Sequence, residues 1–155
     1  MEGQSLKSLI GIAVKNEEEA HVFYLGLADI VEDKTARETL AFLAGEELAH
    51  KEFLLAYLKG EKKFNALPLE EIVDYHIAEY ADKPDIQKNM KSSEVYLVAA
   101  HREWNSYKFY MGLASLQPEG EAKAMLQKMA DQEMKHKEKV EYLYSNTAFP
   151  QTAGG

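Results

Sequence analysis

The chain has 155 residues, of which 46% are hydrophobic and 28% are charged, a size and balance typical of a single globular domain. It contains no cysteine, which excludes disulfides, zinc sites built on thiolates and iron–sulfur clusters. The net charge of -8 disfavours nucleic acid and anionic lipid as partners, because we find no local basic patch that would offset the repulsion.

Apolar residues recur at the spacing of a helix face in the first 60 residues of the chain. This pattern predicts one helix from Leu6 to Val31 and a second from about residue 36 to Leu58. The segment Asp33–Thr35 is predicted to hold the N-cap of the second helix, and Gly60 to follow its C-terminus. Because the connection is short, the two helices should form an antiparallel hairpin.

The hydrophobic pattern is weaker in the connection that follows, at about residues 60–93. Pro68 and Pro84 bracket a short extra helix that we expect near Glu70–Tyr80. Four apolar residues of this segment could cover one side of the protein or contact a second subunit: Val73, Tyr75, Ile77 and Tyr80.

Two further helices are predicted over about residues 94–115 and 121–144, with a turn at Gln117–Gly120 between them. Residues 146–155 are expected to form a flexible tail. The chain would thus contain two helical hairpins joined by one long crossover. This organisation predicts an all-α four-helix bundle that forms a single domain over residues 1–145.

Nothing in the sequence indicates a membrane or secreted protein. No apolar run approaches the ~20 residues that a membrane-spanning helix needs. Met1–Lys7 lacks the basic start and apolar block of a secretory signal. We therefore expect a cytoplasmic protein.

The two hairpins share one pattern when the chain is shifted by 86 residues against itself. The first helix of each hairpin carries one Glu amid small and apolar neighbours, and the second carries the motif Glu-x-x-His. The matched residues are Glu17 with Glu103, Glu47 with Glu133, and His50 with His136.

This repeat predicts a buried site for two metal ions. Residues three apart lie on the same face of a helix, so each Glu-x-x-His motif can bind one ion. Pairing the hairpins would bring four carboxylates and two imidazoles into the core, where unneutralised carboxylates are costly. Two divalent cations would balance the four negative charges, and this set of ligands accepts iron, manganese or zinc.

With these motifs the sequence resembles the ferritin-like di-iron carboxylate proteins, and within them the rubrerythrin family. The resemblance covers about residues 6–145, apart from the crossover. It is carried by the segments 13–24 (AVKNEEEAHVFY) and 42–53 (FLAGEELAHKEF) and by their second copies at 99–110 and 128–139.

The resemblance implies a ferritin-like bundle that holds two iron ions per chain, with manganese or zinc as possible substitutes. Glu47 and Glu133 would bridge the two metals, and His50 and His136 would each complete the ligands of one iron. The remaining carboxylate ligands would be Glu17 and Glu103.

The activity that the resemblance implies is reduction of hydrogen peroxide, with a protective role under oxidative stress. The alternatives are a ferroxidase or dioxygen-dependent oxidase, an iron-binding or storage protein, and a metal or redox sensor with a structural metal. The chain lacks a rubredoxin-like domain, so a separate protein would donate the electrons. Classical rubrerythrins carry an extra Glu where this chain has Ser106, which leaves a symmetric set of four Glu and two His. A homodimer is expected, since rubrerythrin-like domains often form dimers.

The remaining chemically interesting residues have simpler interpretations. Tyr24 and Tyr110 lie two turns beyond Glu17 and Glu103 on the same faces, where they would either pack in the core or hydrogen bond to a ligand carboxylate, with redox participation as a further alternative. Trp104 is adjacent to Glu103 and therefore lies on a different face of the helix, where an aromatic packing role is expected. Three histidines match no repeat position and are expected to have surface or packing roles: His21, His76 and His101.

Overall fold

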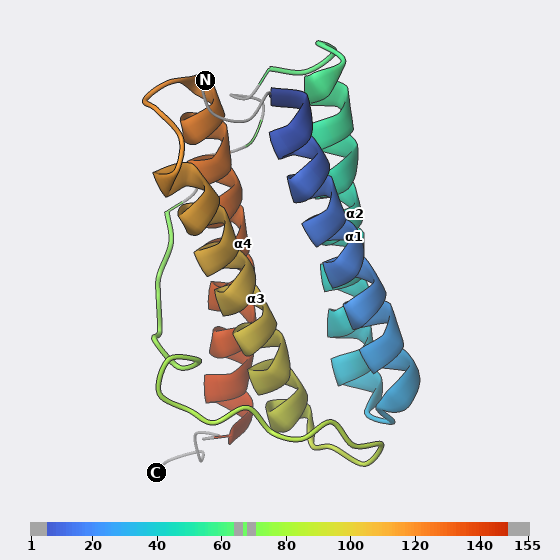
Figure 1. Cartoon of the computed structure of the whole chain (residues 1–155). Coiled ribbons are helices and arrows are strands. Elements are labelled where there is room, and N and C mark those ends of the chain that lie inside the picture. The colour runs from blue at the N-terminus through green and yellow to red at the C-terminus, as the bar shows by residue number, and fades with distance from the viewer. Residues whose placement is uncertain (1–5, 64–66, 68–70, 149–155) are drawn as a thin grey trace.

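In the part of the chain that the structure describes, the protein forms a bundle of four long helices. The structure, a computed structural model, describes residues 6–63, 67 and 71–148. The helices are α1 (Leu6–Ile30), α2 (Lys34–Leu58), α3 (Ser92–Ser115) and α4 (Glu121–Ala148). Figure 1 shows α1 packed along α2 and α3 packed along α4, as two hairpins side by side, with the crossover returning along the α3–α4 hairpin. The described residues contain no strand, which confirms the predicted all-α four-helix bundle.

Both ends of α2 are fixed by local hydrogen bonds that the sequence predicts. The carboxylate of Asp33 accepts from the backbone N–H of Ala36 at 2.8 Å, as an N-cap residue does. At the other end Gly60 has a φ of 79°, a conformation that glycine adopts without strain. The N–H groups of Gly60 and Glu61 bond back to Tyr57 and Ala56, which satisfies carbonyls of the last turn in a Schellman motif.

The apolar core is divided into two clusters along the bundle. One lies toward the α1–α2 turn and includes Leu27, Leu40 and Val98. The other lies toward the opposite end and includes Ile10 and Met125, both with 0% exposure. The middle of the bundle is therefore walled by apolar layers on both sides.

The prediction of a short extra helix near Glu70–Tyr80 is wrong for residues 71–80, the part of that span that the structure describes. These residues contain no helix. The backbone N–H groups of Ile77 and Ala78 instead donate to the carboxylate of Glu141 on α4, at 3.0 and 2.7 Å. His76 has a φ of 51°, which is outside the range of a right-handed helix. The crossover therefore obtains hydrogen bonds from an α4 side chain, and the described part of its own backbone adds only a single turn in which Tyr80 and Ala81 donate to the carbonyl of Ile77.

The helix bounds follow the predicted ones closely at most ends. The main difference is at the C-terminus, where α4 continues to Ala148, so residues 146–148 are helical rather than part of a loose tail. The rest of the predicted tail, residues 149–155, lies outside the described residues. Among the described residues, no helix is both long enough and apolar enough to cross a membrane.

Candidate metal centre

The six repeated residues meet in the middle of the bundle, between the two apolar clusters. α1 and α3 each contribute one carboxylate, and α2 and α4 each contribute a carboxylate and an imidazole. All are buried, with at most 6% exposure, and they are Glu17, Glu47, His50, Glu103, Glu133 and His136.

These side chains form two groups of potential metal ligands. One group is Glu17, Glu47, His50 and Glu133, and the other is Glu47, Glu103, Glu133 and His136. Within each group the ligand atoms lie within 4.8 Å of one another. Glu47 and Glu133 belong to both groups, and these are the two residues that the resemblance implies as the bridging pair.

The imidazoles point their Nδ1 atoms at carboxylates of both hairpins. Nδ1 of His50 lies 3.2 Å from Glu133 and 3.5 Å from Glu17. Nδ1 of His136 lies 2.9 Å from Glu47 and 3.5 Å from Glu103. The two rings stack on each other with centroids 5.2 Å apart. The two copies of the repeated motif therefore make equivalent contacts on either side of the centre.

Tyr24 and Tyr110 hydrogen bond to carboxylates of the opposite hairpin. The hydroxyl of Tyr110 donates to Glu17 at 2.8 Å, and that of Tyr24 donates to Glu103 at 2.7 Å. Burial, followed by the charges of these carboxylates, raises the pKa of both tyrosines well above the usual value. Both therefore remain protonated donors at neutral pH, and they fill the core as well.

Concentrated negative charge dominates the electrostatics of the cluster. Burial and then the neighbouring carboxylates raise the pKa of Glu47 and Glu133 well above the usual range. Burial alone would also raise the pKa of Glu17, but hydrogen bonds with Glu47 and His50 outweigh it and lower that pKa. Burial would lower the pKa of His50, yet Glu133 and Glu17 hold it well above the ordinary value.

The unsatisfied atoms of the cluster fit a pair of divalent cations. Among the described residues, no well-aligned hydrogen bond reaches either oxygen of Glu47 or Glu133, or Oε2 of Glu17 and Glu103, although an imidazole Nδ1 lies close to one oxygen of Glu47 and one of Glu133. Buried carboxylate oxygens without donors are costly unless a cation neutralises them. Carboxylates and imidazoles are ligands that iron, manganese and zinc accept, so the donor set suits such ions.

Ser106 occupies a buried position one turn after Glu103, with 1% exposure. Its hydroxyl accepts a hydrogen bond from Arg102 at 2.7 Å and lies 3.5 Å from the amide nitrogen of Asn16. The position where classical rubrerythrins have a further carboxylate is therefore neutral here and held by neighbouring polar groups. The centre has no carboxylate at this position to bind or release.

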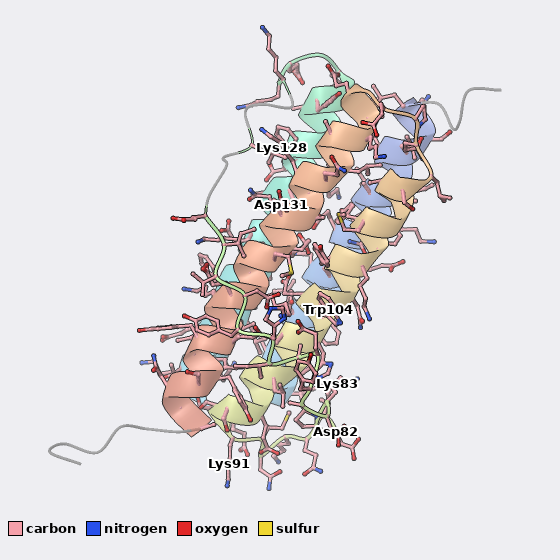
Figure 2. All side chains as sticks on the ribbon, turned by 90° about the vertical axis from the view of Figure 1, so that its left-hand side faces the viewer. Asp82, Lys83, Lys91, Trp104, Lys128 and Asp131 are labelled. Atoms are coloured by element: carbon pink, nitrogen blue, oxygen red, sulfur yellow. The ribbon has the colours of Figure 1, made fainter. Side chains whose placement is uncertain are left out.

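A second buried ionic cluster lies beside the centre and is not predicted by the repeat. Lys137 is fully buried, and its ammonium lies 2.7 Å from Asp74, 2.8 Å from Glu79 and 3.0 Å from Glu141. Its repeat counterpart, Lys51, remains 30% exposed beside Glu18. The difference arises because the crossover covers α4, as Figure 2 shows from the side of the α3–α4 hairpin.

The residues outside the centre pack largely as expected. Trp104 stacks on Tyr107 with centroids 5.4 Å apart, and the Lys137 ammonium lies 5.3 Å from the Trp104 ring. Figure 2 labels Trp104 on α3. His21 and His101 each place a ring nitrogen against a backbone carbonyl, at 2.8 and 2.7 Å. They join elements of the fold and contribute no ligand to the two groups at the centre.

Comparisons with known proteins bear on the fold and the family of the chain. The solved structure of a hypothetical protein from Pyrococcus furiosus is similar over 96% of this chain and 93% of its own, with 24% sequence identity and a TM-score of 0.58, which supports the fold. No curated protein matches the chain at a significant level. The rubrerythrin family model matches residues 8–144, which include both hairpins and all six residues of the centre. The chain therefore belongs to the rubrerythrin family, a family of ferritin-like di-iron proteins.

Proposed function

We propose that this protein is a di-iron enzyme that reduces hydrogen peroxide with electrons from a separate donor. The observation that carries the proposal is the pair of buried ligand groups that share Glu47 and Glu133. Membership of the rubrerythrin family supports the redox role. The absence of cysteine means that the chain has no thiolate-bound iron of its own to supply electrons.

The six buried side chains would hold the two metals. His50 with Glu17 would bind one ion, His136 with Glu103 the other, and Glu47 and Glu133 would bind both. Iron bound there would supply the two electrons that the conversion of one hydrogen peroxide and two protons into two waters requires.

The chain's own residues prepare the site for that chemistry. Tyr110 and Tyr24 donate to Oε1 of Glu17 and Glu103, which fixes the orientation of those carboxylates and leaves their Oε2 atoms without a hydrogen bond and so available to a metal. The apolar clusters above and below, represented by Leu40 and Met129, exclude water from the middle of the bundle. The ligands are thereby held in place before any substrate arrives.

A ferroxidase or dioxygen-dependent oxidase is the second candidate. The neutral, hydrogen-bonded Ser106 favours it, because no additional carboxylate is present to distinguish the two metal positions. The remaining ligands form the symmetric set of four Glu and two His. Such a set provides no obvious reason for peroxide to react faster than dioxygen.

Anaerobic stopped-flow measurements distinguish the two candidates. Protein loaded with two Fe(II) per chain is mixed with hydrogen peroxide or with dioxygen while the ferric absorbance is followed. Much faster oxidation by peroxide is the expected result. Faster oxidation by dioxygen would reject the peroxidase and support the oxidase.

The matched variants for this experiment are Glu17→Gln and Glu19→Gln. Glu17 is buried in the centre, whereas Glu19 lies two residues away on the exposed side of α1. The Glu17 variant should lose rapid oxidation and the Glu19 variant should retain it. Equal oxidation rates in both variants would show that Glu17 is not a metal ligand.

A further inference from the structure

A groove opens on one side of the bundle next to the candidate metal centre. Its volume is about 470 Å³, within the range of small-molecule binding sites. It lies among α2, α4 and the crossover, and the ring of His136 is part of its wall. The groove therefore joins the surface to a residue of the centre.

Aromatic side chains form much of this groove. Phe42 from α2, Tyr75 from the crossover and Tyr142 from α4 are 45%, 39% and 52% exposed. The two tyrosine rings lie 6.4 Å apart and are tilted by 47°. Exposed aromatic rings around a concavity are suited to stacking on a planar aromatic ligand.

The groove also offers a positive charge that has no ion-pair partner among the described residues. Lys135 and Glu138 neutralise each other at 2.7 Å. Lys139 lies 4.8 Å from the Phe42 ring, and no carboxylate of the described residues forms an ion pair with it. Its ammonium is therefore available for an anionic group on a molecule that stacks against Phe42.

The orientation of His136 connects the groove to the centre. Its Nδ1 faces Glu47 at 2.9 Å, while its Nε2 points the other way and lies 3.9 Å from Glu46, another residue of the groove. A ligand in the groove would thus approach one edge of a ring whose other edge lies inside the centre.

The residues that line the groove do not follow the repeat, although the groove lies between helices of both hairpins. Shifting by 86 residues replaces Phe42 with Lys128, Lys139 with Phe53, and Tyr142 with Ala56. The crossover residue Tyr75 has no counterpart. The aromatic walls are therefore not a by-product of the repeated helices that build the centre.

We propose that this groove binds a polycyclic aromatic anion that carries two electrons, with the chemistry of a reduced flavin mononucleotide. The proposal rests on the proposed function, since it assigns the electron donor of the same centre to a small molecule. The aromatic walls would take the ring system, and Lys139 would take the phosphate.

The overall reaction balances with this donor. The dihydroflavin loses two electrons and two protons and becomes the oxidised flavin. Hydrogen peroxide accepts those two electrons and two protons, its O–O bond breaks, and two waters form. No further reductant or proton source is needed.

Fluorescence titration of oxidised flavin mononucleotide tests the groove without any turnover. The full chain is loaded with zinc, so that no electron transfer takes place. Quenching with a dissociation constant in the micromolar range is expected. Riboflavin, which lacks the phosphate, should bind about tenfold more weakly, because it loses one charge-assisted contact.

Two surface variants and one control identify the site. Lys139→Gln should weaken flavin mononucleotide binding about tenfold and leave riboflavin binding unchanged. Tyr142→Ser should weaken both ligands about fivefold through lost stacking. Lys15→Gln, an exposed lysine of α1 outside the groove, should change neither.

The proposal fails if flavin mononucleotide does not bind below millimolar concentration, or if it binds equally well to the Lys139, Tyr142 and Lys15 variants. Failure of the proposed function would be visible separately, as absence of peroxide-driven oxidation in the iron-loaded protein. Flavin binding and peroxide-driven iron oxidation are therefore measured separately, and either result can be positive when the other is negative.

Discussion

At the scale of single residues, the hydroxyl groups of Tyr24 and Tyr110 hold two carboxylates of the centre in place. Each lies within 2.8 Å of a carboxylate from the other hairpin. Removing Tyr110's hydroxyl by Tyr110→Phe keeps the ring that fills the core but frees Glu17 to rotate. We expect metal affinity to fall by about tenfold or more, the usual effect of losing such a supporting hydrogen bond.

Competition titration with a chelator measures this affinity directly. Tyr80→Phe is the matched control, because the Tyr80 side chain is 87% exposed on the crossover. An unchanged affinity in Tyr110→Phe would mean that the tyrosine only packs in the core and does not orient the ligand.

The residues of the centre could be predicted because they are repeated in the sequence, whereas the burial of Lys137 could not. Glu47 and His50 recur at a constant offset in the second hairpin, so each copy of the motif supports the other. Lys137 has a counterpart in Lys51, but the repeat gives no sign that only one of the two is buried. Burial of Lys137 depends on contacts with residues more than 50 positions away, which a local pattern does not contain.

At the scale of elements, the N-cap of α2 provides the simplest test. Asp33 accepts a hydrogen bond from Ala36 in the first turn of the helix. Asp33→Ala leaves that N–H without its partner, and we expect a loss of about 1 kcal/mol in the free energy of unfolding. Chemical denaturation measures it, with Glu38→Ala on the exposed side of the same helix as the control. Equal losses in both variants would show that the cap contributes nothing specific.

The attachment of the crossover to α4 should depend on pH. Burial would raise the pKa of Asp74 and Glu79, but the Lys137 ammonium and His76 hold both below their usual values. A lowered pKa in the folded state means that the stabilisation is present above the unfolded value of about 4 and is lost as pH falls through the folded value.

Asp74→Asn tests that dependence, since an amide oxygen can still accept from the backbone N–H of His76. The variant should be less stable than the parent protein at pH 7, and the difference should shrink toward zero as the pH falls through the lowered pKa of Asp74. Asp82→Asn, an exposed site on the same crossover that Figure 2 labels, is the control. A difference that does not change with pH would show that charge is not what anchors the crossover.

The helices were easier to predict than the crossover because their signals are local. Helical periodicity, the cap at Asp33 and the glycine at position 60 all act within a few residues. Residues 71–80 lack such signals, and their backbone conformation depends on Glu138 and Glu141 of a helix about 60 residues later. Two bracketing prolines limit a helix but do not create one.

For the whole molecule, the metal centre should cost stability when it is empty. Four buried carboxylates repel one another, and removing one such charge is often stabilising. Glu133→Gln should therefore raise the melting temperature of the metal-free protein and lower the number of metals bound per chain. Asp131→Asn, two residues away on the exposed side of α4 and labelled in Figure 2, should change neither. A metal-free Glu133→Gln protein that melts earlier than the parent would contradict this view of the core.

The most direct test of the two-metal centre is an anaerobic titration of the metal-free protein with Fe(II), in parallel with the Glu103→Gln variant. Glu103 is buried in one of the two ligand groups only. The parent chain should bind two ions, and the variant should lose tight binding of one. Binding of one ion or none by the parent chain would contradict the claim that these residues form a two-metal site. Unchanged binding of both ions by the variant would contradict the role of Glu103 as a ligand.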